Sequence, residues 1–522
     1  MIYPPTTPEP QGHHLTTQIL NYQLTHGMHL KHIPLNPRLP HNSPVGSSYP
    51  ISTSVFPTPF PKALFHHAKQ TLQPIYNELY ALLSQNESWL YEAVIRPLLP
   101  VDAFARTLWE IHERLKNEGE QEGGGYGSNI SMGLFRSDYM LHVPDNINED
   151  VKISLFEGEN TGLQLNQVEF NTIACAGGCH ANKVVDMHRY LTKTGVYDSL
   201  SGASDDKEGK GDRDSPIKLS SLPTNDNIKA LADSLAVAHD MYGRPAATRR
   251  AGVLFIVQPD NFNVADELPI EYALWDRDVP VPTHRVEWGV DVLERTCLGG
   301  DRELLFYPHL QGDGSDGGKR QPVEISVVYL RAGLEMHEYD STGIECRVRL
   351  EQSRSIKCPS LLGHIVTFKK VQQALMGPGV LERFLHSEEK VSAIRDTFMS
   401  MYPMDGVSTE GRVGRRLATN PDTSGRYILK PSLEGGGHNI YGEDIPGFLL
   451  GSPIVENVLM SREGVEESDV ISELGVFGLC IWKKGEILRN EAVGWSLKTK
   501  FADVDEMSVV KGFGCFDTPL LV

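Results

Sequence analysis

A run of five consecutive apolar residues, Val253 to Val257, limits the possible fold more than any other segment of the chain. It is far too short to cross a bilayer, and its length suits a buried strand. A helical pattern follows at 268–277, and a second apolar strand follows at 326–331, after a loop at 312–318. Strand, helix and strand in this order are typical of a parallel α/β unit. We therefore expect an inserted α/β domain over residues 251–368.

The remaining sequence predicts a larger body of mixed helices and strands. Apolar residues recur at helical spacing over 63–115 and 230–242, whereas 153–170 alternates as strands do. Ser, Asp, Gly and Lys dominate 201–227, which predicts a disordered insertion. Because 522 residues exceed the size of one hydrophobic core, we expect two or three domains. The pattern along the chain divides it at 1–250, 251–368 and 369–522.

The charge balance argues against a whole class of partners. The chain has 49 basic and 68 acidic residues, a net charge of −19, whereas nucleic-acid binding needs basic surfaces. The N-terminal residues lack the basic stretch and apolar core of a secretory signal, and no membrane segment is expected. Seven scattered cysteines fit reduced thiols better than a disulfide scaffold. We expect a cytoplasmic enzyme that binds small molecules.

The sharpest chemical pattern lies at 427–439, which reads YILKPSLEGGGHN. An apolar strand leads to Lys430, and a loop with Glu434 and three glycines follows. Glycines let backbone N–H groups approach phosphate oxygens, and a lysine neutralises their charge. Glu434 is placed where it could hold Mg²⁺ against those phosphates. The alternative is a flexible hairpin loop with no ligand.

Two strand segments add carboxylates. Glu169 and Asn171 are separated by one residue, so they share one face of a strand and could hold a hard metal ion. Glu473 lies within an apolar strand, where a carboxylate needs a partner. The segment Cys175 to His180 has three residues between its cysteines, which is wrong for a metal or haem motif, so we expect it to line a substrate pocket.

Seven segments in order resemble the eukaryotic glutathione synthetase family. They are Met132–Met140, Gln167–Ile173, Val327–Arg331, Lys357–Pro359, Lys369–Gln373, Lys430–Gly442 and Ile471–Gly478. The resemblance runs from about Ala63 to Val522. It implies an α/β chain of ATP-grasp architecture, in which 1–250 and 369–522 form the ATP-grasp body around the inserted domain, and it implies a homodimer.

The resemblance also implies the residues of a nucleotide site that uses ATP and Mg²⁺. The implied metal ligands are Glu169, Asn171 and Glu434. The implied ATP contacts are Lys369, Lys430, Glu434, Gly435, Gly436, Gly437, Asn439, Tyr441, Val455, Glu456, Val458, Glu473, Lys500 and Glu506. The implied catalytic side chains are Arg136, Arg331 and Lys430.

The implied substrate positions are Arg136, Ile173, Ala174, Cys175, Ala176, Asn263, Glu267, Arg331, Leu334, Lys498, Val509 and Val510. Several depart from the family's residues: Glu267 stands for a glutamine, Leu334 for a tyrosine and Lys498 for an arginine. If Glu267 faced the acidic end of a substrate, like charges would meet and binding would weaken. We therefore expect weaker use of the family's substrates than in a typical member.

In the family, ATP phosphorylates the carboxylate of γ-glutamylcysteine, and the amine of glycine attacks the acylphosphate. The first hypothesis is this reaction. The second is a ligase with the same mechanism and a different acid or amine, and the third is an inactive homologue that acts as a binding protein. Retention of the metal and nucleotide positions argues against the third.

Overall fold

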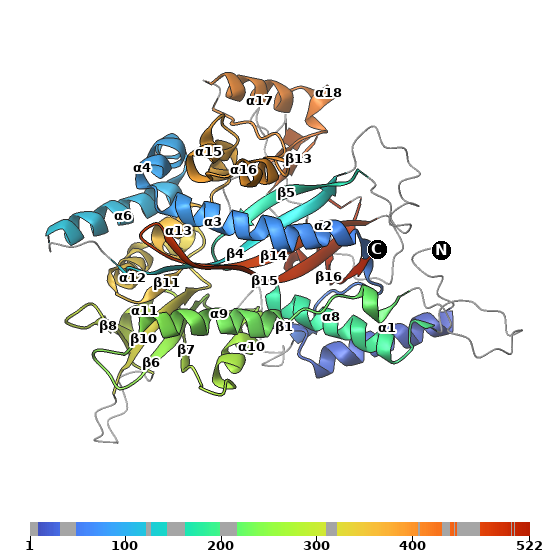
Figure 1. Ribbon diagram of the computed structural model, residues 1–522, viewed down its shortest axis with the longest axis horizontal. Helices are drawn as coiled ribbons and strands as arrows, with labels where there is room; N and C mark the ends of the chain where they lie inside the picture. The colour runs from blue at the N-terminus through green and yellow to red at the C-terminus, as the bar shows by residue number, and fades with distance from the viewer. Residues whose placement is uncertain are drawn as a thin grey trace, which may run out of the picture.

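The computed structural model describes residues 9–31, 48–121, 127–142, 162–198, 217–308, 321–405, 408–430, 439–442, 444–445, 470–502, 504–505 and 507–522. The expected loop at 312–318 and the glycine-rich segment at 431–438 lie outside these residues. Helices and strands are mixed along the chain and surround two main sheets, as expected for an α/β protein (Figure 1). None of the helices described is long and apolar enough to span a membrane.

The central sheet is antiparallel, with the strand order β16-β15-β14-β4-β5. Its strands are β4 (Ser131–His142), β5 (Gln164–Asn171), β14 (Val470–Lys483), β15 (Glu486–Phe501) and β16 (Cys515–Asp517). The β14–β15 hairpin turns at Lys484 and Gly485, whose φ angles of 45° and 86° suit a tight turn. β4 pairs with both β5 and β14, so it joins strands from distant parts of the sequence.

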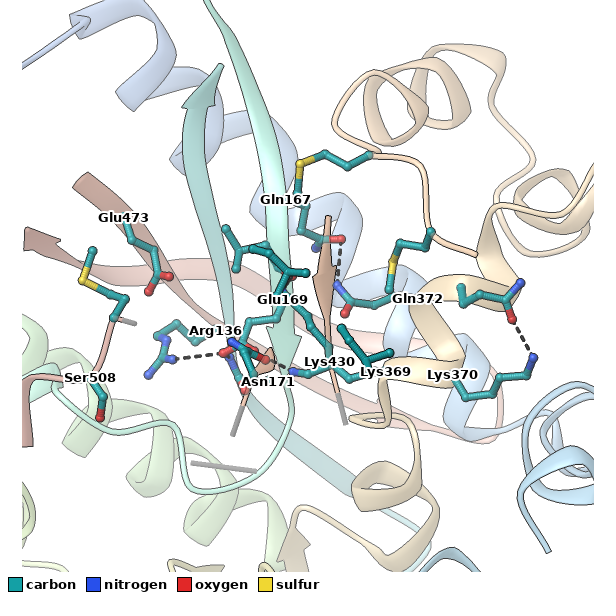
Figure 2. A pocket seen from close by; sticks show the side chains of 18 of the residues that line it. Arg136, Gln167, Glu169, Asn171, Lys369, Lys370, Gln372, Lys430, Glu473 and Ser508 are labelled. Atoms are coloured by element: carbon teal, nitrogen blue, oxygen red, sulfur yellow. Dashed lines mark hydrogen bonds and ion pairs between the residues drawn. The ribbon is translucent and has the colours of Figure 1, made fainter. Parts of the chain in front are cut away.

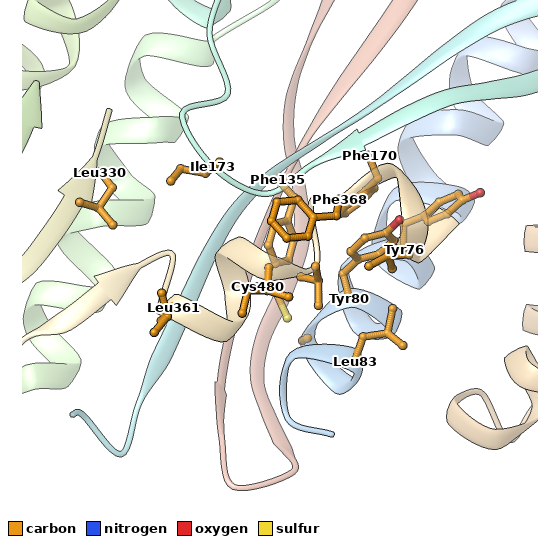
Figure 3. Close-up of a cluster of buried hydrophobic side chains, with 14 of the residues drawn as sticks. Tyr76, Tyr80, Leu83, Phe135, Phe170, Ile173, Leu330, Leu361, Phe368 and Cys480 are labelled. Carbon is orange, nitrogen blue, oxygen red and sulfur yellow. The ribbon is translucent and has the colours of Figure 1, made fainter. Parts of the chain in front are cut away.

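Helices cover both faces of this sheet. α2 (Lys62–His67), η1 (Ala68–Leu72) and α3 (Gln73–Ser84) lie on one face, and α8 (Gly178–Lys193) and α9 (Asn227–Tyr242) contact β15 from the other (Figure 1). Buried aromatic side chains fill the first layer, where the rings of Tyr80 and Phe170 stack at 3.8 Å between centroids (Figure 3). These helices confirm the helical pattern expected over 63–115 and 230–242.

The second sheet has the order β7-β6-β10-β9-β8, and β11 also pairs with β10. Its strands are β6 (Ala251–Val257), β7 (Thr283–Glu287), β8 (Thr296–Leu298), β9 (Leu304–Phe306), β10 (Val323–Leu330) and β11 (Ile356–Cys358). β6, β7, β10 and β11 are parallel, which confirms the expected α/β unit, whereas β8 and β9 add antiparallel pairs that the sequence did not predict. The domain boundaries remain a prediction.

The second sheet packs against the central sheet through helices. α9 contacts β15 as well as β6 and β10, so it lies between the two sheets. α10 begins at Val264, four residues before the expected start. The helices here are α10 (Val264–Trp275), α11 (Val290–Arg295), η5 (Met336–Glu338) and α12 (Ser341–Gln352).

Short elements complete the chain. In the N-terminal half they are α1 (Glu9–Thr25), β1 (His29–Lys31), β2 (Ser48–Pro50), β3 (Thr58–Phe60), α4 (Glu87–Leu90), η2 (Tyr91–Ile95), α5 (Arg96–Leu98), α6 (Ala103–Gln121) and η4 (Leu219–Ser221). In the C-terminal half they are α13 (Leu361–Ile365), α14 (Lys369–Leu375), α15 (Val380–Phe384), α16 (Glu388–Arg395), α17 (Thr409–Thr419), α18 (Pro421–Ser424), β12 (Ile428–Leu429), β13 (Ile440–Tyr441), η6 (Val509–Lys511) and β17 (Pro519–Leu521).

One expectation about disorder is wrong in part. Residues 201–216 lie outside the described residues, but 217–227 are ordered. Ile217 is 0% exposed and Leu222 is 2% exposed, and both belong to a core cluster with α1 and α8. The stretch is polar overall, so its composition predicted disorder, but the buried side chains of Ile217 and Leu222 hold its backbone against the core.

Candidate active site

A cavity of about 1500 Å³ opens beside the central sheet. Every predicted site residue that the structure describes lines it, except Lys500. These lining residues are Arg136, Glu169, Asn171, Ile173, Ala174, Cys175, Ala176, Asn263, Glu267, Arg331, Leu334, Lys369, Lys430, Asn439, Tyr441, Glu473, Lys498, Val509 and Val510. Glu434, Gly435, Gly436, Gly437, Val455, Glu456, Val458 and Glu506 lie outside the described residues.

The first group of side chains in the cavity surrounds Glu169 on β5 (Figure 2). Lys369 Nζ donates to Glu169 Oε2 at 2.6 Å, and Asn171 Nδ2 donates to Glu169 Oε1 at 3.0 Å. Lys430 Nζ donates to the carbonyl of Val168 at 3.1 Å. Burial would raise the pKa of Glu169, but Lys369, Lys430 and Arg136 hold it well below its usual range. Glu169 is therefore ionised, and two lysines lie beside it.

The donor set here suits a hard cation. A carboxylate and an amide side chain lie together on one strand face, and both offer the oxygen ligands that Mg²⁺ prefers. Within the part of the chain that the structure describes, no group of three or more His, Cys, Asp or Glu could hold a metal. The two residues therefore fit one side of a Mg²⁺ site, whose third predicted ligand, Glu434, lies outside the described residues.

Arg136 is held by a residue that the sequence analysis missed. Its Nε donates to Asp138 Oδ1 at 2.7 Å and its Nη2 donates to Asp138 Oδ2 at 2.6 Å, while Nη1 donates to the carbonyl of Ala176 at 2.9 Å. Asp138 is 0% exposed and also accepts from Asn171 at 3.1 Å. One buried carboxylate therefore orients both Arg136, the predicted catalytic arginine, and Asn171, a predicted metal ligand. The sequence could have indicated this pair, because residues two apart on a strand lie on the same face.

The buried carboxylate of Glu473 has an ion-pair partner, as its burial led us to expect. It faces Lys498 across the β14–β15 pairing, and the two side chains form an ion pair. Burial raises the pKa of Glu473, and Lys498 opposes that rise. Glu473, which was expected to contact the nucleotide, and Lys498, which was expected to contact the substrate, are therefore partners in one ion pair. Lys500 lies two residues further along β15, where its Nζ donates to the carbonyl of Val504.

Arg331 directly follows β10, and its guanidinium donates hydrogen bonds to three acceptors. Its Nη1 donates to the carbonyl of Cys175 at 2.8 Å, its Nε to Glu267 Oε1 at 3.2 Å and its Nη2 to Asp266 Oδ2 at 3.3 Å. Arg285 and Asn261 each donate to Glu267 Oε2 at 2.7 Å. Glu267 is therefore not a lone carboxylate, because two arginines pair with it, and these arginines also pair with Asp266 and Glu271. The pairing argues against simple like-charge repulsion of a substrate, and the effect of Glu267 on substrate binding stays a prediction.

The loop between β5 and α8 joins these groups. Ala174 has a φ of 48°, a conformation that a residue with a side chain rarely adopts. Gly177 has a φ of 89°, and a Cβ there would lie 2.9 Å from the ring of Phe516. Asp266 accepts hydrogen bonds from the backbone N–H groups of Gly177 and Cys179, at 2.7 and 2.9 Å. The carboxylate of Asp266 therefore caps the start of α8.

Two cysteines lie close together here: Cys175 in the loop lines the cavity, and Cys179 is buried in the first turn of α8. Cys175 Sγ donates to the carbonyl of Leu134 at 3.2 Å, and Cys179 Sγ donates to the carbonyl of Asp266 at 2.9 Å. All seven cysteines are free thiols, as expected. Of the segment from Cys175 to His180, which was predicted to line a substrate pocket, Cys175, Ala176, Gly177 and His180 line the cavity.

The fold and the cavity define an α/β protein of ATP-grasp architecture. The family model described as eukaryotic glutathione synthase, ATP binding domain, matches residues 9–521. The chain therefore belongs to the eukaryotic glutathione synthase family.

Individual relatives agree with this membership. A glutathione synthetase from Xenopus laevis is 32% identical over 504 residues, which covers 92% of each chain. One from Homo sapiens is 31% identical over 501 residues, covering 92% of this chain and 91% of that protein. Among solved structures, the apo form of a glutathione synthetase-like effector from Globodera pallida has a similar fold, with a TM-score of 0.64 at 18% identity over 98% of this chain and 96% of that one.

Proposed function

We propose that this protein is an ATP- and Mg²⁺-dependent ligase that joins γ-glutamylcysteine to glycine and produces glutathione, ADP and phosphate. The observation that carries the proposal is the convergence of Glu169, Asn171, Lys369, Lys430 and Arg136 on one cavity (Figure 2). Relatives named glutathione synthetase at 28–32% identity over most of the chain favour these substrates over a different acid and amine.

A carboxylate is a poor acyl donor, so the acid must first be activated. Phosphoryl transfer needs mainly positioning and neutralisation of charge. Lys369 and Lys430 supply positive charge beside Glu169, and Arg136, locked by Asp138, presents a fixed guanidinium to the reacting carboxylate. Mg²⁺, when bound by Glu169 and Asn171, would neutralise phosphate charge. The carboxylate oxygen would take the γ-phosphoryl group of ATP as ADP leaves. The neutral amine of glycine would then attack the acyl carbon, and phosphate would leave as the nitrogen loses a proton to solvent.

Apolar residues shape the rest of the cavity. Ile173, Leu334, Val509 and Val510 line it, and once substrates fill the cavity this apolar surface would help to keep water from the acylphosphate. Val509 and Val510 begin η6, the expected amine end of the cavity. We also propose, from the family resemblance, that the protein acts as a homodimer in the cytoplasm.

The experiment mixes purified protein with Mg-ATP, γ-glutamylcysteine and glycine, and measures ADP, AMP, phosphate and glutathione. We expect ADP and phosphate in equal amounts with glutathione, and no AMP. Glu169→Gln should lower kcat at least about 100-fold because it removes a ligand and the partner of Lys369. Glu78→Gln, which breaks the remote Glu78–Lys390 pair, is the matched control and should keep the wild-type rate. A wild type that makes no glutathione would refute the proposal.

A further inference from the structure

A buried carboxylate lies next to the strand that carries Lys498, at a position to which the sequence gave no role. Asp517 on β16 is 0% exposed. In the pairing of β16 with β15 it stands opposite Leu497, one residue before Lys498, which lines the cavity. A carboxylate buried at this position requires a specific set of hydrogen-bond donors.

The partners that the structure describes for Asp517 are hydroxyl and N–H groups. Ser54 Oγ donates to Asp517 Oδ1 at 2.5 Å, and the backbone N–H of Thr518 donates to the same oxygen at 2.6 Å. The hydroxyls of Thr58 and Thr499 both donate to Oδ2, the second at 2.7 Å. Burial raises the pKa of Asp517, and these four donors oppose the rise. Distances this short are typical of hydrogen bonds to an ionised carboxylate.

The side-chain donors come from two distant parts of the chain. Ser54 and Thr58 belong to an N-terminal segment that backbone hydrogen bonds hold against the C-terminal strands. The N–H of Ser54 donates to the carbonyl of Phe516, and β3, which begins at Thr58, pairs with β17. Thr499, in contrast, belongs to β15. One carboxylate therefore ties the end of β15 to a segment that is already fixed.

Thr499 lies between two lysines of the proposed site. Successive side chains of a strand point to opposite faces, so Thr499 points toward Asp517 while Lys498 and Lys500 share the other face. On that face Lys498 forms its ion pair with Glu473. The position of the backbone at Thr499 therefore sets where both lysine side chains begin.

The hydroxyl of Thr499 has a single hydrogen, and Asp517 accepts it. Ser472 stands opposite Thr499 in the β14–β15 pairing, and the two hydroxyl oxygens are 2.8 Å apart. Because Thr499 donates to Asp517, Ser472 must donate in this second bond. The hydrogen bonds therefore run in one direction across three strands, from β14 through β15 to β16, one residue along from the pair of Glu473 and Lys498.

We propose that Asp517 is a positioning residue for the nucleotide site, and that it acts through the Thr499 hydroxyl to fix the end of β15 before the nucleotide binds. The inference rests on the proposed function, because that function makes Lys500 and Glu473 contacts of ATP. Without the bond from Thr499, the end of β15 and its lysines would have to be ordered when the nucleotide binds. Ordering of this kind costs binding free energy, so the affinity for the nucleotide would fall.

The test compares nucleotide binding in variants that each lose one donor, by titration calorimetry with Mg²⁺ and adenosine 5′-(β,γ-imido)triphosphate. Thr499→Val removes the donor on β15 and keeps the shape of the side chain, so the dissociation constant should rise at least about fivefold. Thr58→Val is the matched control, because it removes the other hydroxyl from the same carboxylate oxygen but does not touch β15. Its dissociation constant should change less than about twofold. Thermal unfolding should show similar falls in Tm for both variants, which separates positioning from a general loss of stability.

Further variants identify the hydrogen bond that matters. Thr499→Ser keeps the hydroxyl and should bind the nucleotide within about twofold of the wild type. Ser472→Ala removes the second partner of Thr499, leaves the bond to Asp517, and should also bind like the wild type. Asp517→Asn should weaken binding at least as much as Thr499→Val does. Combining these two changes should cause little further loss, because both remove the same interaction.

Unchanged nucleotide binding in Thr499→Val would overturn the inference, and so would an equal loss of affinity in Thr58→Val or in Ser472→Ala. Each of these results leaves the proposed function standing if the wild type makes glutathione. A wild type that makes no glutathione refutes the proposed function, while the dissociation constants for the nucleotide still decide the role of Asp517. A loss of affinity in Thr499→Val that Thr499→Ser restores supports the inference.

Discussion

Lys369 on α14 and Glu169 on β5 form an ion pair, with Nζ and Oε2 2.6 Å apart. The lysine proposed to bind phosphate thus also sets the charge of the carboxylate proposed to bind the metal. Lys369→Met should raise the KM for ATP at least about tenfold, because it removes a positive charge from phosphate and leaves Glu169 underpaired. Lys370→Met is the control, since Lys370 Nζ donates to Gln373 Oε1 at 2.6 Å and not to the metal-binding group. Equal changes in KM would contradict this role of Lys369.

Asp138→Asn should lower both kcat and stability. The buried guanidinium of Arg136 would lose its charged partner, which costs about 3 kcal/mol in the free energy of unfolding, and Arg136 would lose its fixed orientation. Urea unfolding and steady-state rates measure the two effects. Asp233→Asn breaks exposed pairs with Lys229 and Arg277 and should change the free energy of unfolding by less than about 1 kcal/mol. A stable, fully active Asp138→Asn protein would refute the orienting role.

Glu267→Gln should weaken the protein, contrary to what the sequence alone suggested. The change leaves Arg331 and Arg285 with one negative partner fewer, and Arg331 is 6% exposed. We expect a loss of about 1–3 kcal/mol in the free energy of unfolding and a higher KM for the acid substrate. Unfolding by urea and initial-rate kinetics check both. A gain in kcat/KM for γ-glutamylcysteine would restore the repulsion argument.

Gly177→Ala should destabilise the protein more than Gly379→Ala. Both glycines precede a helix in the left-handed conformation, with φ angles of 89° and 75° and ψ near 0°, so both substitutions carry its strain, about 1 kcal/mol. A Cβ at Gly177 also meets the ring of Phe516 at 2.9 Å, whereas nothing lies within 4 Å of one at Gly379. The clash should add about 1–3 kcal/mol. Thermal unfolding of the two variants compares them, and equal losses would show that the Phe516 ring simply moves aside.

Acid should destabilise the protein through His188. This residue is 0% exposed, its Nδ1 lies 2.7 Å from the hydroxyl of Tyr197, and burial lowers its pKa from 6.5 to about 3. Because the folded pKa is the lower one, the unfolded chain binds the proton first as pH falls. Stability that is present above pH 6.5 is then lost progressively down to about pH 3. His188→Gln should make the free energy of unfolding fall less steeply with pH across that window, and an identical slope would exclude His188 as a cause.

The sequence predicted the parts of the site that lie in short continuous segments. Glu169 and Asn171 share a strand face, and Lys369 and Lys430 lie beside them as the family resemblance implied. The apolar run at 253–257 likewise marks β6, which is buried along its whole length. Spacing and periodicity predicted the strand face of Glu169 and Asn171 and the strand β6, because these features depend on neighbours in the sequence, whereas Lys369 was implied only by the family resemblance.

Contacts between distant residues were not predictable in this way. Asp266 caps α8 from another helix, and Arg285 neutralises Glu267 from β7. Nothing in the spacing of these residues shows that they meet. The same holds for Ile217, whose burial depends on α1 and α8 and not on its polar neighbours. Tertiary packing decides these positions, and neither composition nor local propensity contains information about contacts between distant residues.

The pairing of β4 with β14 has a consequence for the synthesis of this protein. The strand that carries Arg136 meets its partner only after residues 470–483 have been made, and the wall with Lys498 comes later still. Contacts so far apart in sequence close large loops, which slows folding. During translation, the edge of β4 that later pairs with β14 has no partner strand, and an exposed strand edge can pair with other chains and aggregate. Until the last tenth of the chain is made, this edge of β4 is therefore open to non-native pairing on the ribosome.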